Sequence, residues 1–200
     1  NEEKEMMKMM SEDFKVKLPP VKRVAVKILN VVSPGEFYFT SECREEEILD
    51  YQKMIQYKFK PTSVEQDIDH VWKVNEKCLV HHELKTAWRE FFRAIVVKEL
   101  KDKTYTLFLI DFGIEITSFA HHMSIMPEQF KTFPAGAIKA HLFGITHPLN
   151  TIDSSWPQST LELFQNLINK FKMHCVSVFL QDNLEGDSLP VILWGVVKKN

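Results

Sequence analysis

Two short apolar runs separated by a charged turn constrain the fold of this chain more than any other feature. The first extends over Glu90–Val97 and the second over Tyr105–Asp111, with Lys101-Asp102-Lys103 between them. Aromatic and β-branched residues recur in both runs, which favours strands over helices. The pattern therefore predicts two antiparallel strands joined by a tight turn, and a glycine at Gly113 indicates a second turn directly after them.

Similar strand patterns occur on both sides of this pair. Short segments rich in alternating apolar residues are bounded by turn signals, and Pro34-Gly35 joins the first two segments into a hairpin. The predicted segments are Val24–Ile28, Phe37–Thr40, Lys77–Val80, Glu115–Phe119, Leu142–Ile145, Cys175–Leu180 and Leu189–Val197. Strands of this length and spacing predict a mainly β fold built from small barrels.

Two helices are predicted beside these strands. The first begins at Ser41, a residue type that suits a helix N-cap, and continues to Ile55. The second begins at Ser159-Thr160 and carries its apolar residues on one stripe: Leu161, Phe164, Leu167, Ile168 and Phe171. The two ends of the chain each lack enough strands to close a core. We therefore expect them to combine into one five-stranded barrel, with the strands of 70–130 inserted as a second small barrel.

Composition favours a folded intracellular chain and limits its partners. The 200 residues are 44% hydrophobic, and a net charge of −2 suits a cationic peptide better than a phosphate backbone. Three widely separated cysteines do not form a disulfide framework, and no apolar run of the sequence is long enough to cross a membrane. The first residue is Asn1, so we expect the chain to be part of a larger multidomain protein.

The two central strands resemble the signature of a Tudor domain. The run ending in Phe92-Arg93-Ala94 is similar to its "W-Y-R-A" motif, and Leu107–Glu115 is similar to "V-x-F-V-D-Y-G-N-x-E". Further similarities follow in the expected order, at Val32-Ser33-Pro34, Phe37-Tyr38, Met126–Phe130, Pro134-Ala135, Ala137-Ile138 and Trp156. Together they resemble an extended Tudor domain, in which a Tudor core is inserted into a split OB-type barrel like that of staphylococcal nuclease.

The resemblance implies a division of the chain and a role for it. Residues 1–20 are expected to form a tail or docking helix, and 21–60 the first part of the nuclease-like barrel with a linker helix. Residues 70–130 are expected to form the Tudor core, and 131–200 the second part of the barrel. Such domains recruit Piwi-family Argonautes through an arginine-rich N-terminal tail, within the perinuclear germ granules (nuage) where small RNAs silence transposons.

The resemblance also locates a binding pocket whose aromatic box is incomplete. In the family, aromatic rings and one asparagine enclose a dimethylated arginine, and each favourable ring contributes about 0.5–2 kcal/mol. Phe92 and Phe112 stand at two tyrosine positions and keep the ring, whereas Leu109 replaces a third aromatic residue. Ile114 replaces the asparagine. These losses weaken selective binding of methylarginine.

Other candidate pocket residues follow from the same comparison. The remaining aromatic position falls at His82 or Trp88. Asp111 and Glu115 are candidate carboxylates for an unmethylated guanidinium, although Asp111 has an alternative role as a structural partner of Arg93. Three interpretations stay open: a pocket for an arginine peptide that does not require methylation, a repacked methylarginine cage, or a domain used only for scaffolding, self-association or RNA binding.

Catalytic chemistry finds little support in the sequence. The candidate barrel strands Val24–Leu29 and Cys175–Leu180 lack the acidic cluster that a metal nuclease needs. His81-His82 and His121-His122 are adjacent pairs without the spacing of a zinc site. We therefore expect no enzymatic activity, no metal and no cofactor. Direct RNA binding is disfavoured, because the lysines gather mainly at turns and termini.

Overall fold

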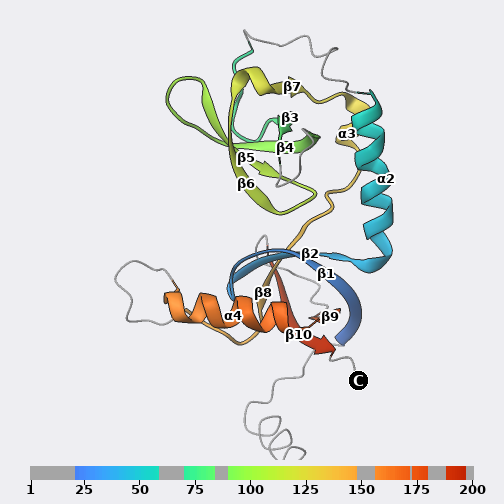
Figure 1. Ribbon diagram of the computed structural model, residues 1–200, viewed down its shortest axis with the longest axis vertical. Coiled ribbons are helices and arrows are strands. Elements are labelled where there is room, and N and C mark those ends of the chain that lie inside the picture. The colour runs from blue at the N-terminus through green and yellow to red at the C-terminus, as the bar shows by residue number, and fades with distance from the viewer. Residues whose placement is uncertain are drawn as a thin grey trace, which may run out of the picture.

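Two lobes joined by a helix make up the part of the chain that the structure describes (Figure 1). The computed structural model describes residues 21–58, 70–83, 90–147, 156–171, 173–179 and 188–196. One lobe is a closed barrel and the other is a five-stranded sheet. The predicted fold class, mainly β with few helices, is confirmed.

The barrel combines strands from both ends of the chain. Its strands are β1 (Val21–Ser33), β2 (Glu36–Ser41), β8 (Ile138–Leu142), β9 (Met173–Phe179) and β10 (Leu189–Val196), in the order β1-β2-β8-β10-β9. Neighbouring strands are antiparallel except β8 and β10, which are parallel. The alternation predicted for β1 and β2 supplies the core, and helix α4 (Gln158–Lys170) adds Phe164 and Ile168 to it. Two parts of the sequence, separated by residues 42–137, thus form one barrel.

The long strand β1 changes partner along its length. It pairs with β9 from Val21 to Val26, and with β2 from Val26 to Ser33. The second ladder contains a register shift between Ile28 and Asn30, and such bulges bend a strand and increase its twist. Figure 1 shows β1 curving over the barrel on the side that faces the other lobe.

The second lobe contains the strand pair that dominates the sequence. Strands β3 (Lys77–His82), β4 (Glu90–Glu99), β5 (Thr104–Leu109), β6 (Ile114–Phe119) and β7 (Met123–Ile125) form one sheet in the order β6-β5-β4-β3-β7. A 3-10 turn, η2 (Ala120–His122), connects β6 to β7. Inward side chains from these strands, with Trp72, form a separate core.

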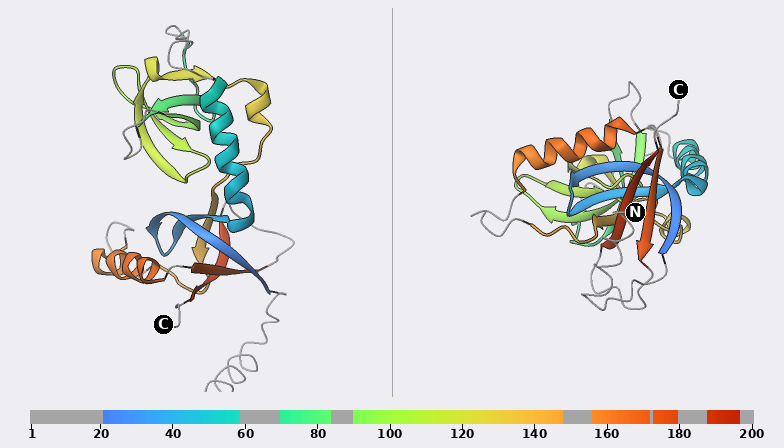
Figure 2. Two further views of the ribbon diagram at one scale, coloured as in Figure 1. Left: turned by 45° about the vertical axis from the view of Figure 1, so that its right-hand side comes forward. Right: turned by 90° about the horizontal axis from the view of Figure 1, so that it is seen from below.

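Helix α2 (Glu42–Lys58) connects the barrel to the sheet (Figure 2). Its Gln52 amide donates to the Phe91 carbonyl at 2.5 Å, and Gln56 both donates to that carbonyl and accepts from the Phe91 N–H. The backbone groups of Phe91, at the start of β4 and before its ladder with β5 begins, are therefore satisfied by side chains of α2. The short α3 (Glu128–Lys131) lies in the segment that returns to the barrel.

Three element predictions were wrong in detail. The strand predicted over Leu142–Ile145 is β8, which ends at Leu142 because Gly144 has φ +74°. The strand predicted to end at Asp111 ends at Leu109, whose carbonyl accepts the next turn's N–H groups. Leu167, placed on the apolar stripe of the second predicted helix, is 46% exposed, and the buried residues of α4 are Phe164 and Ile168. None of the described helices combines the length and apolar character that a membrane span requires.

Candidate functional site

A buried ion pair fixes the geometry of the candidate site. Arg93 on β4 donates to both carboxylate oxygens of Asp111, at 2.9 and 2.5 Å, and the two side chains are 0% and 3% exposed. Arg93 also donates to the carbonyls of Phe130, Phe133 and Pro134, at 3.1, 2.7 and 3.0 Å. Asp111 is therefore the structural partner of Arg93, one of the two roles expected for it. Its carboxylate is not available to a ligand guanidinium.

The same ion pair positions the turn that carries Phe112. The Gly136 N–H donates to Asp111 Oδ1 at 2.9 Å, and the Ala137 N–H donates to the Ile110 carbonyl at 3.0 Å. The Arg93 guanidinium lies 4.9 Å from the ring centre of Tyr51 on α2, within the range of a cation–π contact. Contacts with the sheet, with the segment that returns to the barrel and with the connecting helix α2 therefore all fix the position of residues 110–113.

The structure brings together four of the residues expected in the aromatic box. Phe92 packs edge to face on Phe112, with ring centres 5.3 Å apart and planes at 86°. Phe92 is 2% exposed and Leu109 is 0% exposed, and both belong to the core of the sheet. Ile114 is half-buried opposite Leu109 in the β5–β6 ladder. Of these side chains, Phe112 and Ile114 retain appreciable exposed surface.

Of the other expected pocket residues, Glu115 faces away from this group, and His82 lies on the same face of the sheet as Phe92, two residues beyond Val80, the ladder partner of Phe92. Glu115 is exposed on the opposite face of β6, in register with Phe108. His82 is half-buried at the end of β3, where the ladder pairs it with Glu90. Trp88 lies outside the described residues. Glu115 thus faces outward beside the barrel lobe rather than into the group around Phe112.

The two lobes touch at the end of this turn. The Asn30 amide of β1 donates to the Gly113 carbonyl at 2.6 Å, and Tyr38 of β2 packs on Phe108 with ring centres 5.3 Å apart. Gly113 has φ +67°, and a Cβ there would lie 2.4 Å from Tyr38. Burial, together with a hydrogen bond to Glu36 and nearby carboxylates, raises the pKa of Tyr38. Its hydroxyl therefore stays neutral at this junction.

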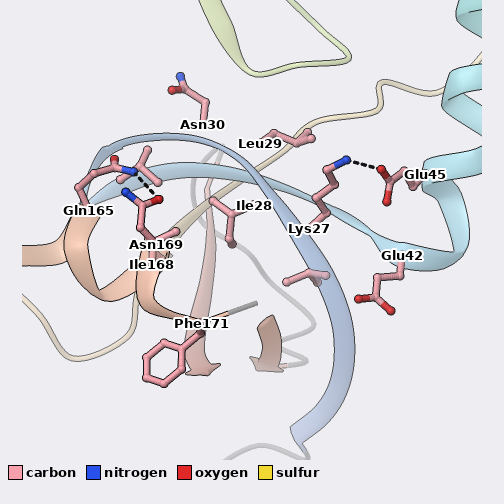
Figure 3. Close-up of a pocket in the computed structure, with 12 residues that line it drawn as sticks. Lys27, Ile28, Leu29, Asn30, Glu42, Glu45, Gln165, Ile168, Asn169 and Phe171 are labelled. Atoms are coloured by element: carbon pink, nitrogen blue, oxygen red, sulfur yellow. Dashed lines mark hydrogen bonds and ion pairs between the residues drawn. The ribbon is translucent and has the colours of Figure 1, made fainter. Parts of the chain in front are cut away.

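Two clefts adjoin the junction. A small one of about 70 Å³ is lined by Phe112 and Asp111 on one side and by residues of β1, β2 and α2 on the other. A larger one of about 730 Å³ lies along β1, between the start of α2 and helix α4 (Figure 3). The clefts share Lys27, Leu29 and Glu45. Only the larger cleft has the volume of an ordinary ligand site, which is roughly 300–1,000 Å³.

The larger cleft has an acidic lining. Lys27 and Glu45 form an ion pair whose side chains are 54% and 34% exposed, and Glu42 stands nearby on the rim. Two carboxylates against one ammonium leave a net negative lining. A partly exposed pair of this kind contributes roughly 0–1 kcal/mol to stability, so an incoming cation can replace Lys27 at little cost. This arrangement can accept a guanidinium.

Sequence analysis did not identify the cleft. Lys27 lies on a predicted strand and Glu45 in a predicted helix, where an early acidic residue is explained by the helix dipole. Their pairing depends on how α2 leaves the barrel. The remaining wall comes from α4, well over a hundred residues further along the chain. A possible signal was the pair of amides Gln165 and Asn169, four residues apart on one side of that helix.

Comparison with known proteins identifies relatives of both parts of the fold. Residues 18–144 match the Tudor domain family, which covers more than half of the chain. The fold is similar to the human TDRD1 extended Tudor domain, solved with a symmetrically dimethylated peptide, at TM-score 0.75 and 16% identity. That alignment covers 92% of this chain and 86% of the other.

Two further solved structures show the same architecture. An extended Tudor domain of mouse TDRD1, in complex with a MILI peptide containing dimethylarginine, aligns at TM-score 0.69 and 18% identity, covering 90% of this chain and 86% of that one. The Drosophila melanogaster Papi extended Tudor domain, in complex with an unmethylated Piwi N-terminal peptide, also aligns at TM-score 0.69, with 15% identity and coverage of 90% and 92%. The comparison with curated protein sequences gave no match.

Proposed function

Because the chain belongs to the Tudor domain family, whose members are non-catalytic binding modules, we propose that it binds an arginine-containing N-terminal tail of a Piwi-family Argonaute without requiring arginine methylation. A single-residue variant of the Papi extended Tudor domain, a structural relative, was solved in complex with a Piwi N-terminal peptide in both its unmethylated and its symmetrically dimethylated form. The proposed role is recruitment of the Argonaute within a larger scaffold protein, in perinuclear germ granules. The barrel half has no nuclease activity in this proposal.

One observation carries the proposal: a carboxylate and an exposed aromatic edge adjoin the same small cleft. Glu45 and Phe112 both line this cleft, and the Glu45 carboxylate forms an ion pair with Lys27. An arginine guanidinium that displaces Lys27 gains a charge-assisted hydrogen bond to Glu45 and stacks beside Phe112. The arginine side chain reaches this position from the larger cleft, since Lys27, Leu29 and Glu45 line both.

The same residues explain why methylation is not required. Leu109 offers no ring face and is fully buried, and Ile114 offers no amide to orient a guanidinium. An unmethylated guanidinium has five N–H donors, and symmetric dimethylation replaces two of them with methyl groups. Methylation keeps the charge but blocks bidentate hydrogen bonding. A site built on carboxylate acceptors therefore favours the unmodified side chain.

Calorimetric titration of one Piwi N-terminal peptide, unmodified and symmetrically dimethylated, tests the proposal. We expect the unmodified peptide to bind at least as tightly as the dimethylated one. Glu45→Gln should weaken it several-fold, because an ion pair at a partly exposed carboxylate contributes roughly 0–1 kcal/mol. Glu46→Gln, on the exposed side of the same helix, is the matched control.

A second variant separates the aromatic contribution. Phe112→Leu keeps the apolar packing against Phe92 but removes the ring, and should also weaken the unmodified peptide. Clear preference for the dimethylated peptide would show that another aromatic residue completes a cage and would contradict the proposal. Absence of binding by either peptide, with the domain folded, would favour the scaffolding role instead.

A further inference from the structure

An unpaired strand edge lines the larger cleft. Within the described residues, β9 accompanies β1 only as far as the Val26–His174 pair. From Lys27 to Ser33 the ladder of β1 is with β2 alone. Apart from the register shifts between Ile28 and Asn30 and between Val31 and Ser33, alternate residues of such a stretch direct their N–H and C=O groups away from the paired strand. These groups are available to a further strand, and residues 26–31 of β1 line the cleft.

Helix α4 forms the opposite wall of this edge. Ile168 and Phe171 contribute apolar surface, and Gln165 and Asn169 contribute amides that hydrogen bond to each other at 3.4 Å (Figure 3). A second hollow of about 390 Å³ continues the cleft past Val31, between β1 and the start of α4. The trough therefore follows β1 for about six residues, roughly 20 Å at the rise of an extended chain.

The charge of the trough indicates what it binds. Glu42 and Glu45 stand at one end and Glu162 at the other, against the single lysine Lys27. Three carboxylates and one ammonium repel a phosphate backbone and attract a basic chain. Side-chain amides along α4 can both donate to and accept from a peptide main chain.

We propose that an extended basic peptide segment adds as a strand to β1 over residues 27–32, in the trough between β1 and α4. This inference rests on the proposed function, because the segment flanks the bound arginine in the same tail. Main-chain hydrogen bonds to β1 supply affinity without sequence specificity, and the carboxylates select for positive charge. Flanking residues of the tail thereby contribute to binding in addition to the arginine.

Peptide length and backbone methylation test the strand. The first probe is about five residues centred on the arginine of the Piwi peptide, and the second is extended by about eight residues of its natural sequence on each side. We expect the longer peptide to bind about tenfold more tightly or better. In an added strand, every second N–H group of the peptide faces β1. N-methylation of these amides in one flank should therefore weaken binding of the longer peptide, and N-methylation of the intervening amides should not.

Charge variants on α4 test the location. Gln165→Lys combined with Asn169→Lys should bring the affinity of the longer peptide close to that of the short one. Ser159→Lys, on the same helix and away from both hollows, is the matched control and should change neither affinity. Because the variants lie on exposed helix positions, an unchanged thermal unfolding midpoint reports that the fold is intact.

Each outcome separates this inference from the proposed function. Equal affinity of the short and long peptides, or equal effects of N-methylation at the two alternating sets of amides, would contradict the added strand. Neither result would contradict the arginine site. Loss of binding by both peptides would overturn both proposals. A dimer of the unliganded domain that the Gln165→Lys and Asn169→Lys pair dissolves would assign the edge to a second copy of the chain, against the peptide.

Discussion

Replacing Asp111 by asparagine removes one charge from the most buried ion pair among the described residues. The substitution preserves shape but places an N–H₂ or a neutral oxygen where the Arg93 guanidinium needs a carboxylate. The guanidinium is 0% exposed and cannot reach water without opening the sheet. Removing one partner of such a pair costs about 3–5 kcal/mol, because a buried charge is left uncompensated.

Urea unfolding followed by tryptophan fluorescence measures this cost. With a slope of about 1–3 kcal/mol per molar urea, the midpoint should fall by roughly 2 M. Asp50→Asn is the matched control: Asp50 is 64% exposed and pairs with Lys53 on the surface of α2, so its midpoint should move little. A midpoint for Asp111→Asn that equals the Asp50→Asn value would refute the assignment of Asp111 as a structural residue.

A double variant shows whether stability depends on the charge of the Arg93–Asp111 pair alone or also on the hydrogen bonds from Arg93 to the three carbonyls. Replacing both members of a buried pair by apolar residues is often neutral. Here Arg93→Met with Asp111→Leu should remain destabilised, because the carbonyls of Phe130, Phe133 and Pro134 lose their donor as well. Recovery of the original midpoint would mean that these three hydrogen bonds contribute little.

Two further predictions concern the lobe junction and the thiols. Gly113→Ala should lower the melting temperature well beyond Gly144→Ala, because both have positive φ but only the first meets Tyr38, at 2.4 Å; equal shifts would show that the junction yields freely. Burial raises the pKa of the Cys78 thiol to about 12, while Cys43 is exposed. Iodoacetamide at pH 8 should therefore alkylate Cys43 and spare Cys78 in the folded protein, as peptide mass spectrometry can measure.

The strands were predictable because their signals are local. Alternation in β1 and the Pro34-Gly35 turn locate the first hairpin, and its ladder pairs Ser33 with Glu36 around that turn. The errors arose where tertiary contacts decide the boundary. Strand β5 ends at Leu109 because Asp111 turns back to pair with Arg93. The apolar character of the neighbouring residues does not predict this contact.

The candidate site was predictable only in part. Motif spacing located Phe92 and Phe112, which pack together, and also the Arg93–Asp111 pair. It could not show that Phe92 is buried in the core, since that depends on how the sheet closes. Nor could it show the cleft, because its walls come from β1, α2 and α4, and their approach depends on the barrel's register and on where β9 leaves β1.

On the proposed function, the loss of the aromatic box reverses the preference between methylated and unmethylated arginine in addition to weakening it. A missing ring removes about 0.5–2 kcal/mol of cation–π attraction, and with it part of the preference for a methylated arginine. A carboxylate acceptor distinguishes them differently, because a methyl group in place of an N–H leaves the acceptor unpaired. Sites built to hydrogen bond a group reject an analogue that lacks it more strongly than apolar sites reject an added methyl. On the proposed function, with Leu109 in the core and Glu45 beside Phe112, the remaining chemistry would penalise methylation, and a tail would bind no more tightly once its arginine is modified.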